Sequence, residues 1–232
     1  MYIAQNIAQI IERMARAATL SGRSPDEVTL LAISKTFPKE SISDAIAAGL
    51  TKFGENRVQE AETKIPAFAG VSGLEWHLVG HLQSNKAKRA VELFDMIHSV
   101  DNLKLAERLN KFCLELGKKI SVLIQVDLGE EETKFGADPS QIGQLAESIL
   151  NLSGLQLNGL MTIPPFFENP DEVRPFFARL RSLRDSLETE RPGCLGRQHL
   201  SMGMSHDFEA AIQEGATIVR IGTAIFGSRP QV

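Results

Sequence analysis

The chain has 232 residues, enough for one large domain or two small ones with a substantial buried core. Its 25 Lys and Arg are interspersed with 29 Asp and Glu, which argues against a general binder of nucleic acid or of membrane surfaces. No apolar run reaches the length of a membrane span, the first residues lack signal-peptide features, and Cys113 and Cys194 form no metal-type or redox-type pair. We therefore expect a cytoplasmic protein with no membrane or nucleic-acid partner.

The first half of the sequence alternates between the apolar pattern of buried strands and that of amphipathic helices. Strands are predicted at residues 28–34, 52–56, 74–79 and 96–100. Helices are predicted at residues 3–18, 39–48, 57–64 and 84–93. Asp101 is expected to cap a further helix that runs to Leu116.

The second half repeats this alternation. Strands are predicted at residues 120–126, 155–163, 198–201 and 217–221, and helices at residues 138–150, 170–187 and 205–213. Asp138 and Pro139 supply a cap and a first-turn proline, and Asn169 with Pro170 is expected to begin the next helix.

About eight strands alternating with helices, at this chain length, predict a (β/α)₈ barrel with one extra N-terminal helix. The main alternative is an open doubly wound sheet, but no Gly-x-Gly-x-x-Gly follows the first strand. No composition shift or linker divides the chain, so residues 1–232 are expected to form a single α/β TIM-barrel domain.

Lys35 is the first candidate for chemistry. It follows the apolar run of the first strand, which places it at the barrel mouth where active sites of this fold lie. Desolvating an ammonium is costly, so a lysine at this position is either an ordinary surface residue or an amine held for a reaction.

A phosphate site is predicted at the same barrel mouth. The loops after strands seven and eight offer small residues with accessible backbone N–H groups and hydroxyls, namely Ser201, Gly203, Gly222 and Thr223. Barrels often bind phosphate with these two loops. The simpler interpretation is that the glycines only form turns.

A lysine together with a phosphate cradle fits two chemistries: a Schiff-base sugar-phosphate enzyme of the aldolase type, or a site for pyridoxal 5'-phosphate (PLP). Arg220 lies inside the apolar last strand and needs an acceptor, which an unprotonated pyridine nitrogen would supply. The alternative is a structural ion pair between Arg220 and a barrel carboxylate such as Glu55.

Several segments closely resemble, in order and spacing, those of the pyridoxal phosphate homeostasis protein (YggS/PROSC) family. They are residues 34–36, 53–60, 76–86, 98–101, 134–136, 159–161, 200–205 and 219–227. The resemblance spans nearly the whole chain. One departure is Arg57, where the family often has tyrosine, and it affects only the edge of the pocket. The family is similar to the barrel domain of alanine racemase standing alone, the fold type III PLP architecture.

The resemblance implies a role for each candidate residue. Lys35 would carry PLP as an internal aldimine, and Arg220 would face the pyridine nitrogen. Ser201, Gly222 and Thr223 would hold the phosphate, with Gly203 in the same loop. Asn56 and Met161 would line the cofactor ring.

The implied function is intracellular homeostasis of PLP and of amino and keto acids, without an established turnover reaction. The chain stops at Val232 and its only tyrosine is Tyr2, so neither the second domain of the racemases nor its catalytic tyrosine is expected. No catalytic residue is assigned. A racemase-like PLP enzyme is the alternative function, PLP-requiring apoenzymes are the candidate partners, and a monomer is expected.

Two weaker signals remain. His77 and His81 have a metal-like interval, but in a strand and its loop the two side chains are expected to lie far apart, so no metal site is predicted. Lys134 follows strand five at the mouth, where a second amine would be able to receive PLP, although a flexible loop charge is the simpler interpretation.

Overall fold

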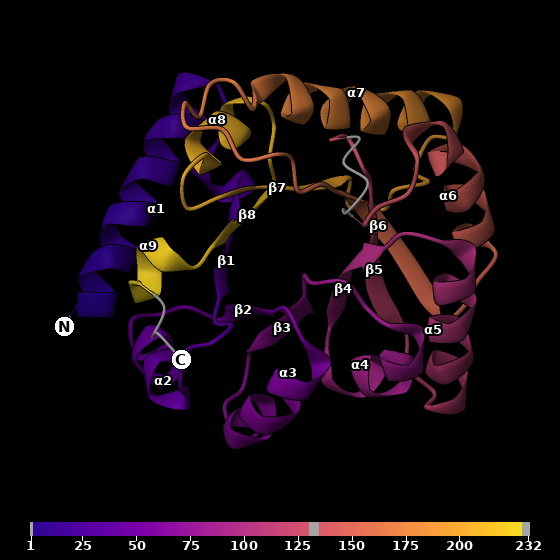
Figure 1. The fold of residues 1–232 in the computed structure, drawn as a ribbon, viewed down its shortest axis with the longest axis horizontal. Coiled ribbons are helices and arrows are strands. Elements are labelled where there is room, and N and C mark those ends of the chain that lie inside the picture. Colours follow the sequence, from indigo (N-terminus) through magenta and orange to yellow (C-terminus); the bar gives the residue numbers. More distant parts are fainter. Residues whose placement is uncertain (1, 130–134, 229–232) are drawn as a thin grey trace.

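The computed structural model, which describes residues 2–129 and 135–228, is a closed barrel of parallel strands in the order β1 to β8. Figure 1 shows the strands as an inner ring with the helices around it. The strands are β1 (Thr29–Ile33), β2 (Lys52–Glu55), β3 (Glu75–Leu78), β4 (Met96–Val100), β5 (Ile120–Gln125), β6 (Leu155–Met161), β7 (His199–Met204) and β8 (Ile218–Ile221). The predicted (β/α)₈ barrel is confirmed.

Helix α1 precedes the first strand, and the other helices follow strands along the chain. They are α1 (Tyr2–Leu20), α2 (Lys39–Ala47), α3 (Val58–Lys64), α4 (Ala87–Leu93), α5 (Leu103–Glu115), α6 (Ile142–Leu150), α7 (Arg174–Glu190), α8 (Phe208–Gln213) and α9 (Thr223–Phe226). Short 3₁₀ turns are η1 (Pro25–Glu27), η2 (Ile65–Phe68), η3 (Ser84–Lys86) and η4 (Pro139–Gln141). Within the part of the chain described, none of the helices combines the length and apolar character needed to cross a bilayer.

The strands alternate between an outer face, which packs under the helices, and an inner face, which fills the barrel. An apolar cluster occupies the interior and consists of Leu31, Ile33, Val79, Met96, Leu123, Met161 and Ile218. Polar side chains share this interior, because Arg220 pairs in register with Leu31, and His77 with Gly54. The inside of the barrel is therefore partly polar, which is unusual for the fold.

The extra N-terminal helix is confirmed as α1, which packs along α8 and α9 outside the barrel (Figure 1). Its buried face is formed by Ile7, Ile10 and Met14, as the helical spacing predicts. Arg13 adds a two-pronged ion pair to Glu209 of α8, with N–O distances of 3.1 and 2.7 Å.

Two predicted helix starts are wrong. The helix expected at Asn169-Pro170 begins at Arg174, because the Asn169 side chain accepts a hydrogen bond from the Asp171 N–H in a separate turn. The helix after β4 is capped by Asn102, whose side chain accepts from the Leu105 N–H at 2.9 Å. Asp101 was expected in that role.

The end of the chain also differs from the prediction. Strand β7 runs three residues further than expected, to Met204, and α8 begins only at Phe208 because Asp207 turns back to accept from the Met204 N–H at 2.6 Å. The short helix α9 was not predicted, since four residues are too few to show a helical period.

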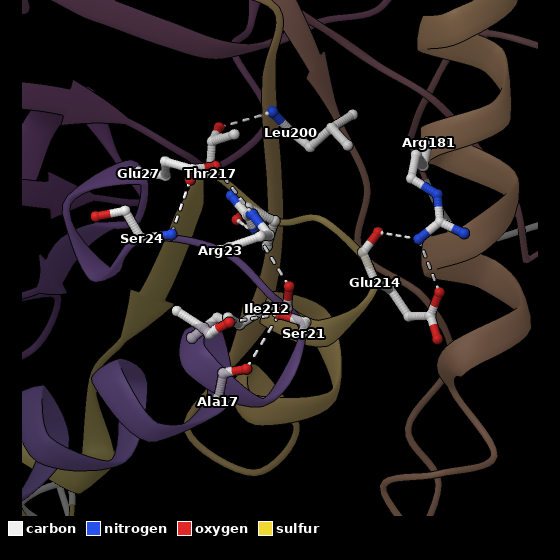
Figure 2. A network of polar contacts seen from close by, with 12 residues as sticks. Ala17, Ser21, Arg23, Ser24, Glu27, Arg181, Leu200, Ile212, Glu214 and Thr217 are labelled. Atoms are coloured by element: carbon white, nitrogen blue, oxygen red, sulfur yellow. Dashed lines mark hydrogen bonds and ion pairs between the residues drawn. The ribbon is translucent and has the colours of Figure 1, made fainter.

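Arg23 fixes the chain between α1 and β1 to the turn between α8 and β8 (Figure 2). Its guanidinium donates to the carbonyl oxygens of Ile212 at 2.9 Å and Ala216 at 2.8 Å, and pairs with Glu27 at 3.2 Å. On the far side of this turn, Arg181 of α7 donates to the Glu214 carbonyl at 2.6 Å. Two arginines thus hold the last crossover of the barrel through main-chain acceptors.

We predict that Arg23→Ala destabilises the protein by about 1–3 kcal/mol, because partly buried carbonyls lose a charged donor. Equilibrium urea denaturation measures the change. Arg16→Ala is the matched control: that side chain is 71% exposed and lies 3.8 Å from Glu209, so its loss should change stability by less than about 0.5 kcal/mol. Equal effects of the two substitutions would contradict the anchoring role of Arg23.

Candidate functional site

A cavity of about 620 Å³ lies at the carboxyl ends of the strands. The structure brings five of the eight predicted site residues to its wall: Lys35, Asn56, Arg220, Gly222 and Thr223. They come from the ends of β1, β2 and β8, so the closure of the barrel between its first and last strands assembles the site. These loops are where barrel enzymes and binding proteins carry their chemistry.

The other three predicted residues are buried beneath the wall. Met161 belongs to the apolar cluster inside the barrel. Gly203 has φ +89°, and a Cβ at this position would lie 2.5 Å from the Ala211 Cβ, so its glycine is needed to pack β7 against α8. Ser201 is fully buried, and its hydroxyl contacts Arg220 and His98. Ser201 was expected to hold a phosphate at the barrel mouth, but its hydroxyl lies below the cavity wall, between Arg220 and His98.

Ser205 places a hydroxyl in the cavity wall beside the loop after β8, the position at which a phosphate-binding hydroxyl was expected. It lines the cavity, and its Oγ accepts from the N–H groups of Gly222 and Ala224, both at 3.3 Å. The hydroxyl therefore joins the loop after β7 to the loop after β8. Sequence reasoning missed Ser205 because it ended the strand at Ser201; a strand extended to Met204 would have placed Ser205 first beyond it.

A buried lysine fixes the backbone on both sides of Lys35. The Lys64 ammonium, on α3, donates to the Ser34 carbonyl at 2.8 Å and to Glu55 Oε1 at 3.0 Å. It also pairs with Glu60, which accepts from the Thr36 N–H. This contact accompanies a left-handed backbone at Thr36, with φ +68°, a conformation that is unfavourable for a β-branched residue.

Glu55 is the counter-ion inside this arrangement. Its carboxylate is fully buried and accepts from the Ser34 hydroxyl at 2.7 Å as well as from Lys64. Burial raises the pKa of Glu55, while Lys64 and Ser34 oppose the shift. Because Glu55 pairs with Lys64, the ion pair considered between Glu55 and Arg220 is wrong.

Arg220 is a buried cation held by neutral acceptors. Nη1 donates to Ser201 Oγ at 2.8 Å and Nη2 to the Thr162 carbonyl at 2.9 Å. Burial lowers the pKa of Arg220 to about 10, with Asp207 opposing the shift, so the guanidinium remains charged near neutral pH. Within residues 2–129 and 135–228 no carboxylate forms an ion pair with it, so the cavity floor presents a positive hydrogen-bond donor.

The mouth of the cavity carries exposed rings. His81 stacks on Phe135, with ring centroids 3.6 Å apart. Phe166 is 75% exposed, and its ring centroid lies 5.3 Å from that of His206. An open rim of this kind admits a planar molecule of the size of a cofactor. Lys134, the second amine considered at the mouth, lies outside the described residues.

The two histidines with the metal-like interval do not meet. His77 points into the barrel and contacts His98, whereas His81 lies at the mouth. Among the residues that the structure describes, there is no group of three or more His, Cys, Asp or Glu side chains placed to hold a metal ion.

We predict that Lys64→Met costs about 3–5 kcal/mol of unfolding free energy, because it leaves the Glu55 carboxylate buried without its partner. The double variant Lys64→Met/Glu55→Gln should recover part of the loss, since it removes both charges. Urea denaturation measures both, with the exposed Lys88→Met as control. A Lys64 variant as stable as the Lys88 variant would show that the ion pair does not hold this loop.

Comparison with known proteins supports a family assignment. The family model described as "Alanine racemase, N-terminal domain" matches residues 5–230. A solved alanine racemase from Corynebacterium glutamicum has a TM-score of 0.70 at 16% identity, and the match covers 100% of this chain and 61% of that chain. At this level of identity the likeness concerns the fold alone.

Two similar proteins match over their whole length. The pyridoxal phosphate homeostasis protein of Aquifex aeolicus (strain VF5) is 46% identical over 229 residues, 99% of each chain. A structure of PipY from Synechococcus elongatus PCC7942 with PLP bound has a TM-score of 0.84 at 41% identity, covering 97% of this chain and 100% of that chain. With this cavity at the end of a barrel of the racemase type, the chain belongs to the pyridoxal phosphate homeostasis protein family.

Proposed function

We propose that this protein binds PLP in the cavity at the barrel mouth and takes part in the intracellular homeostasis of PLP and of amino and keto acids. The observation that carries the proposal is the convergence of a primary amine, a buried guanidinium and a small-residue cradle on one cavity, through Lys35, Arg220 and the loop at Gly222. PLP bound to PipY, and the name of the Aquifex aeolicus relative, support it.

The residues present fit the chemistry of PLP. Lys35 supplies the amine that condenses with the aldehyde, and Arg220 supplies a donor for the pyridine nitrogen. Ser205 and Thr223 offer hydroxyl donors for the phosphate, Gly222 lets the backbone approach it closely, and Asn56 borders the ring. A Cβ at Gly222 would lie 3.3 Å from the Ile33 carbonyl, so a side chain there would crowd this wall. Ser205 thus replaces Ser201 in the proposed phosphate set.

We infer that the protein holds the cofactor and does not turn it over. Bound PLP acts as an electron sink, and this capacity depends on protonation of its ring nitrogen. Arg220 keeps its own protons near neutral pH, so it donates to that nitrogen and does not protonate it. The only tyrosine, Tyr2, begins α1, and its ring lies beside Gly227, outside the cavity wall.

The remaining parts of the proposal concern the cellular setting. We propose that residues 1–232 act as one PLP-binding domain in the cytoplasm, as a monomer, and that PLP-requiring apoenzymes receive the cofactor. The open, ring-lined mouth supports hand-over, because a bound cofactor at this position stays within reach of other molecules.

We predict that protein purified and incubated with PLP is yellow, and that borohydride fixes the cofactor covalently to Lys35. Lys35→Ala should lose both the visible absorbance and the covalent product, because it lacks the condensing amine. Absorption spectroscopy and peptide mass spectrometry measure these outcomes.

The matched control is Lys39→Ala, since Lys39 is exposed at the start of α2 and should leave the spectrum unchanged. Loss of colour in both variants, or a colourless wild-type protein, would contradict the proposal. Exchange of the α-proton of amino-acid enantiomers with deuterated solvent, by PLP-loaded protein but not by Lys35→Ala, would favour the racemase-like alternative.

A pair of serines tests the phosphate set. We predict that Ser205→Ala weakens PLP binding by about tenfold, roughly the value of one hydrogen bond to a charged group, and leaves the binding of pyridoxal unchanged. Ser201→Ala should weaken both ligands alike, because it acts through Arg220. Equilibrium titration of each variant with PLP and with pyridoxal measures the ratio. A selective loss of PLP binding in Ser201→Ala instead would restore Ser201 to the phosphate set.

A further inference from the structure

A line of hydrogen bonds runs through the barrel interior from the cavity floor toward the opposite end. Arg220 Nη1 donates to Ser201 Oγ at 2.8 Å, and this oxygen lies 2.9 Å from His98 Nδ1. His98 Nε2 lies 2.9 Å from His77 Nδ1. Beyond these hydrogen bonds, His77 Nε2 faces Glu75 Oε2 at 3.6 Å, an ion-pair distance at which no hydrogen bond forms. The line thus connects a cation beside the cavity to a carboxylate at the start of β3.

The His98 imidazole is neutral. His98 is fully buried, and burial, His77 and Arg220 together hold its pKa well below the usual range. A neutral imidazole carries one N–H, so the His98 ring donates at one nitrogen and accepts at the other. The hydrogens of this line can then run in one of two directions through His98, which gives two sets of hydrogen positions.

In the first set both hydrogen bonds of His98 pair a donor with an acceptor. The Ser201 hydroxyl donates to His98 Nδ1, and His98 Nε2–H donates to His77 Nδ1. His77 Nδ1 then carries no hydrogen, so the His77 proton lies on Nε2 and faces the Glu75 carboxylate at 3.6 Å, beyond hydrogen-bond distance. Each bond dipole then runs from the Arg220 cation toward the Glu75 anion, which is the favourable direction for all of them.

The second set reverses the line and meets two penalties. The lone pair of His77 Nε2 would face the Glu75 oxygen, and the Ser201 hydrogen would need another acceptor. His77, the larger cause, and Lys52 together lower the pKa of Glu75 to about 2, so this carboxylate is charged near neutral pH and repels a lone pair. A buried hydroxyl without an acceptor costs about 1–3 kcal/mol.

We propose that His98 and His77 are positioning residues of the PLP site, each carrying its proton on Nε2, with Glu75 setting their direction. The hydrogen of Ser201 is committed to His98, so the serine oxygen presents only lone pairs to Arg220. The guanidinium is thereby held between this oxygen and the Thr162 carbonyl, with its remaining donors toward the cavity. The effect on the cofactor rests on the proposed function, but the proton positions do not.

Nuclear magnetic resonance of full-length protein labelled with ¹⁵N-histidine, without added PLP, tests the proton positions. We expect His77 and His98 as neutral Nε2–H tautomers at neutral pH, assigned by the loss of one set of signals in His77→Gln and in His98→Gln. A protonated His98, or its Nδ1–H tautomer, overturns the proposal.

Glu75 can be substituted without disturbing the core, because its side chain is 48% exposed. We expect Glu75→Gln to raise the Nδ1–H fraction of both rings together, because an amide faces either tautomer equally well and the rings share one hydrogen bond. Glu115→Gln, on the exposed face of α5, is the control. Unchanged rings in Glu75→Gln overturn the role of Glu75.

Binding to pyridoxal separates this proposal from the proposed function. His98→Leu removes both hydrogen bonds of the ring, and we expect it to weaken pyridoxal binding by about tenfold, with partial recovery in His98→Gln. Unaltered binding in His98→Leu overturns the positioning role. If wild-type protein binds no PLP while the tautomers are as expected, the proposed function fails and the proton positions stand.

Discussion

The buried ammonium of Lys64 is the contact on which the geometry of the cavity wall depends. A lysine inside a protein is stable only when acceptors replace its water, and here two carboxylates and a main-chain carbonyl do so. Two of its links reach the backbone on either side of Lys35, directly at Ser34 and through Glu60 at Thr36. Lys35, which lines the cavity, is therefore carried by a backbone segment that Lys64 holds in place.

Arg220 solves the same problem differently. Lys64 is neutralised by carboxylates, but Arg220 receives only a hydroxyl and a carbonyl oxygen. The positive charge of Lys64 is therefore neutralised by carboxylates inside the protein. Arg220, the other buried cation, has no carboxylate ion-pair partner within residues 2–129 and 135–228, and it lines the cavity.

The sequence predicts the fold well because each strand and helix carries its own local period. The barrel, the extra helix and the position of Lys35 at the end of β1 all follow from apolar patterns and turn residues. Boundaries fail where a polar side chain redirects the backbone, as Asp207 does at α8 and Asn169 before α7.

The candidate site was predictable where a residue follows a strand directly, and not where it acts through tertiary contacts. Ser205 was missed because the strand was ended three residues early. Lys64 reads as an ordinary charge on a helix, and the contact of His77 with His98 depends on barrel register, which the spacing within one strand cannot show. The burial of Ser201 beneath the wall has the same origin.

The pairing of β1 with β8 has a consequence for the order in which the protein becomes functional. The cavity combines Lys35 and Asn56 with Ser205, Arg220 and Gly222, which come from the two ends of the chain. Contacts so distant in sequence form late in folding, because a long loop must close first. The wall of the cavity is therefore incomplete until β8 has paired with β1. A ligand that binds in this cavity would report a closed barrel.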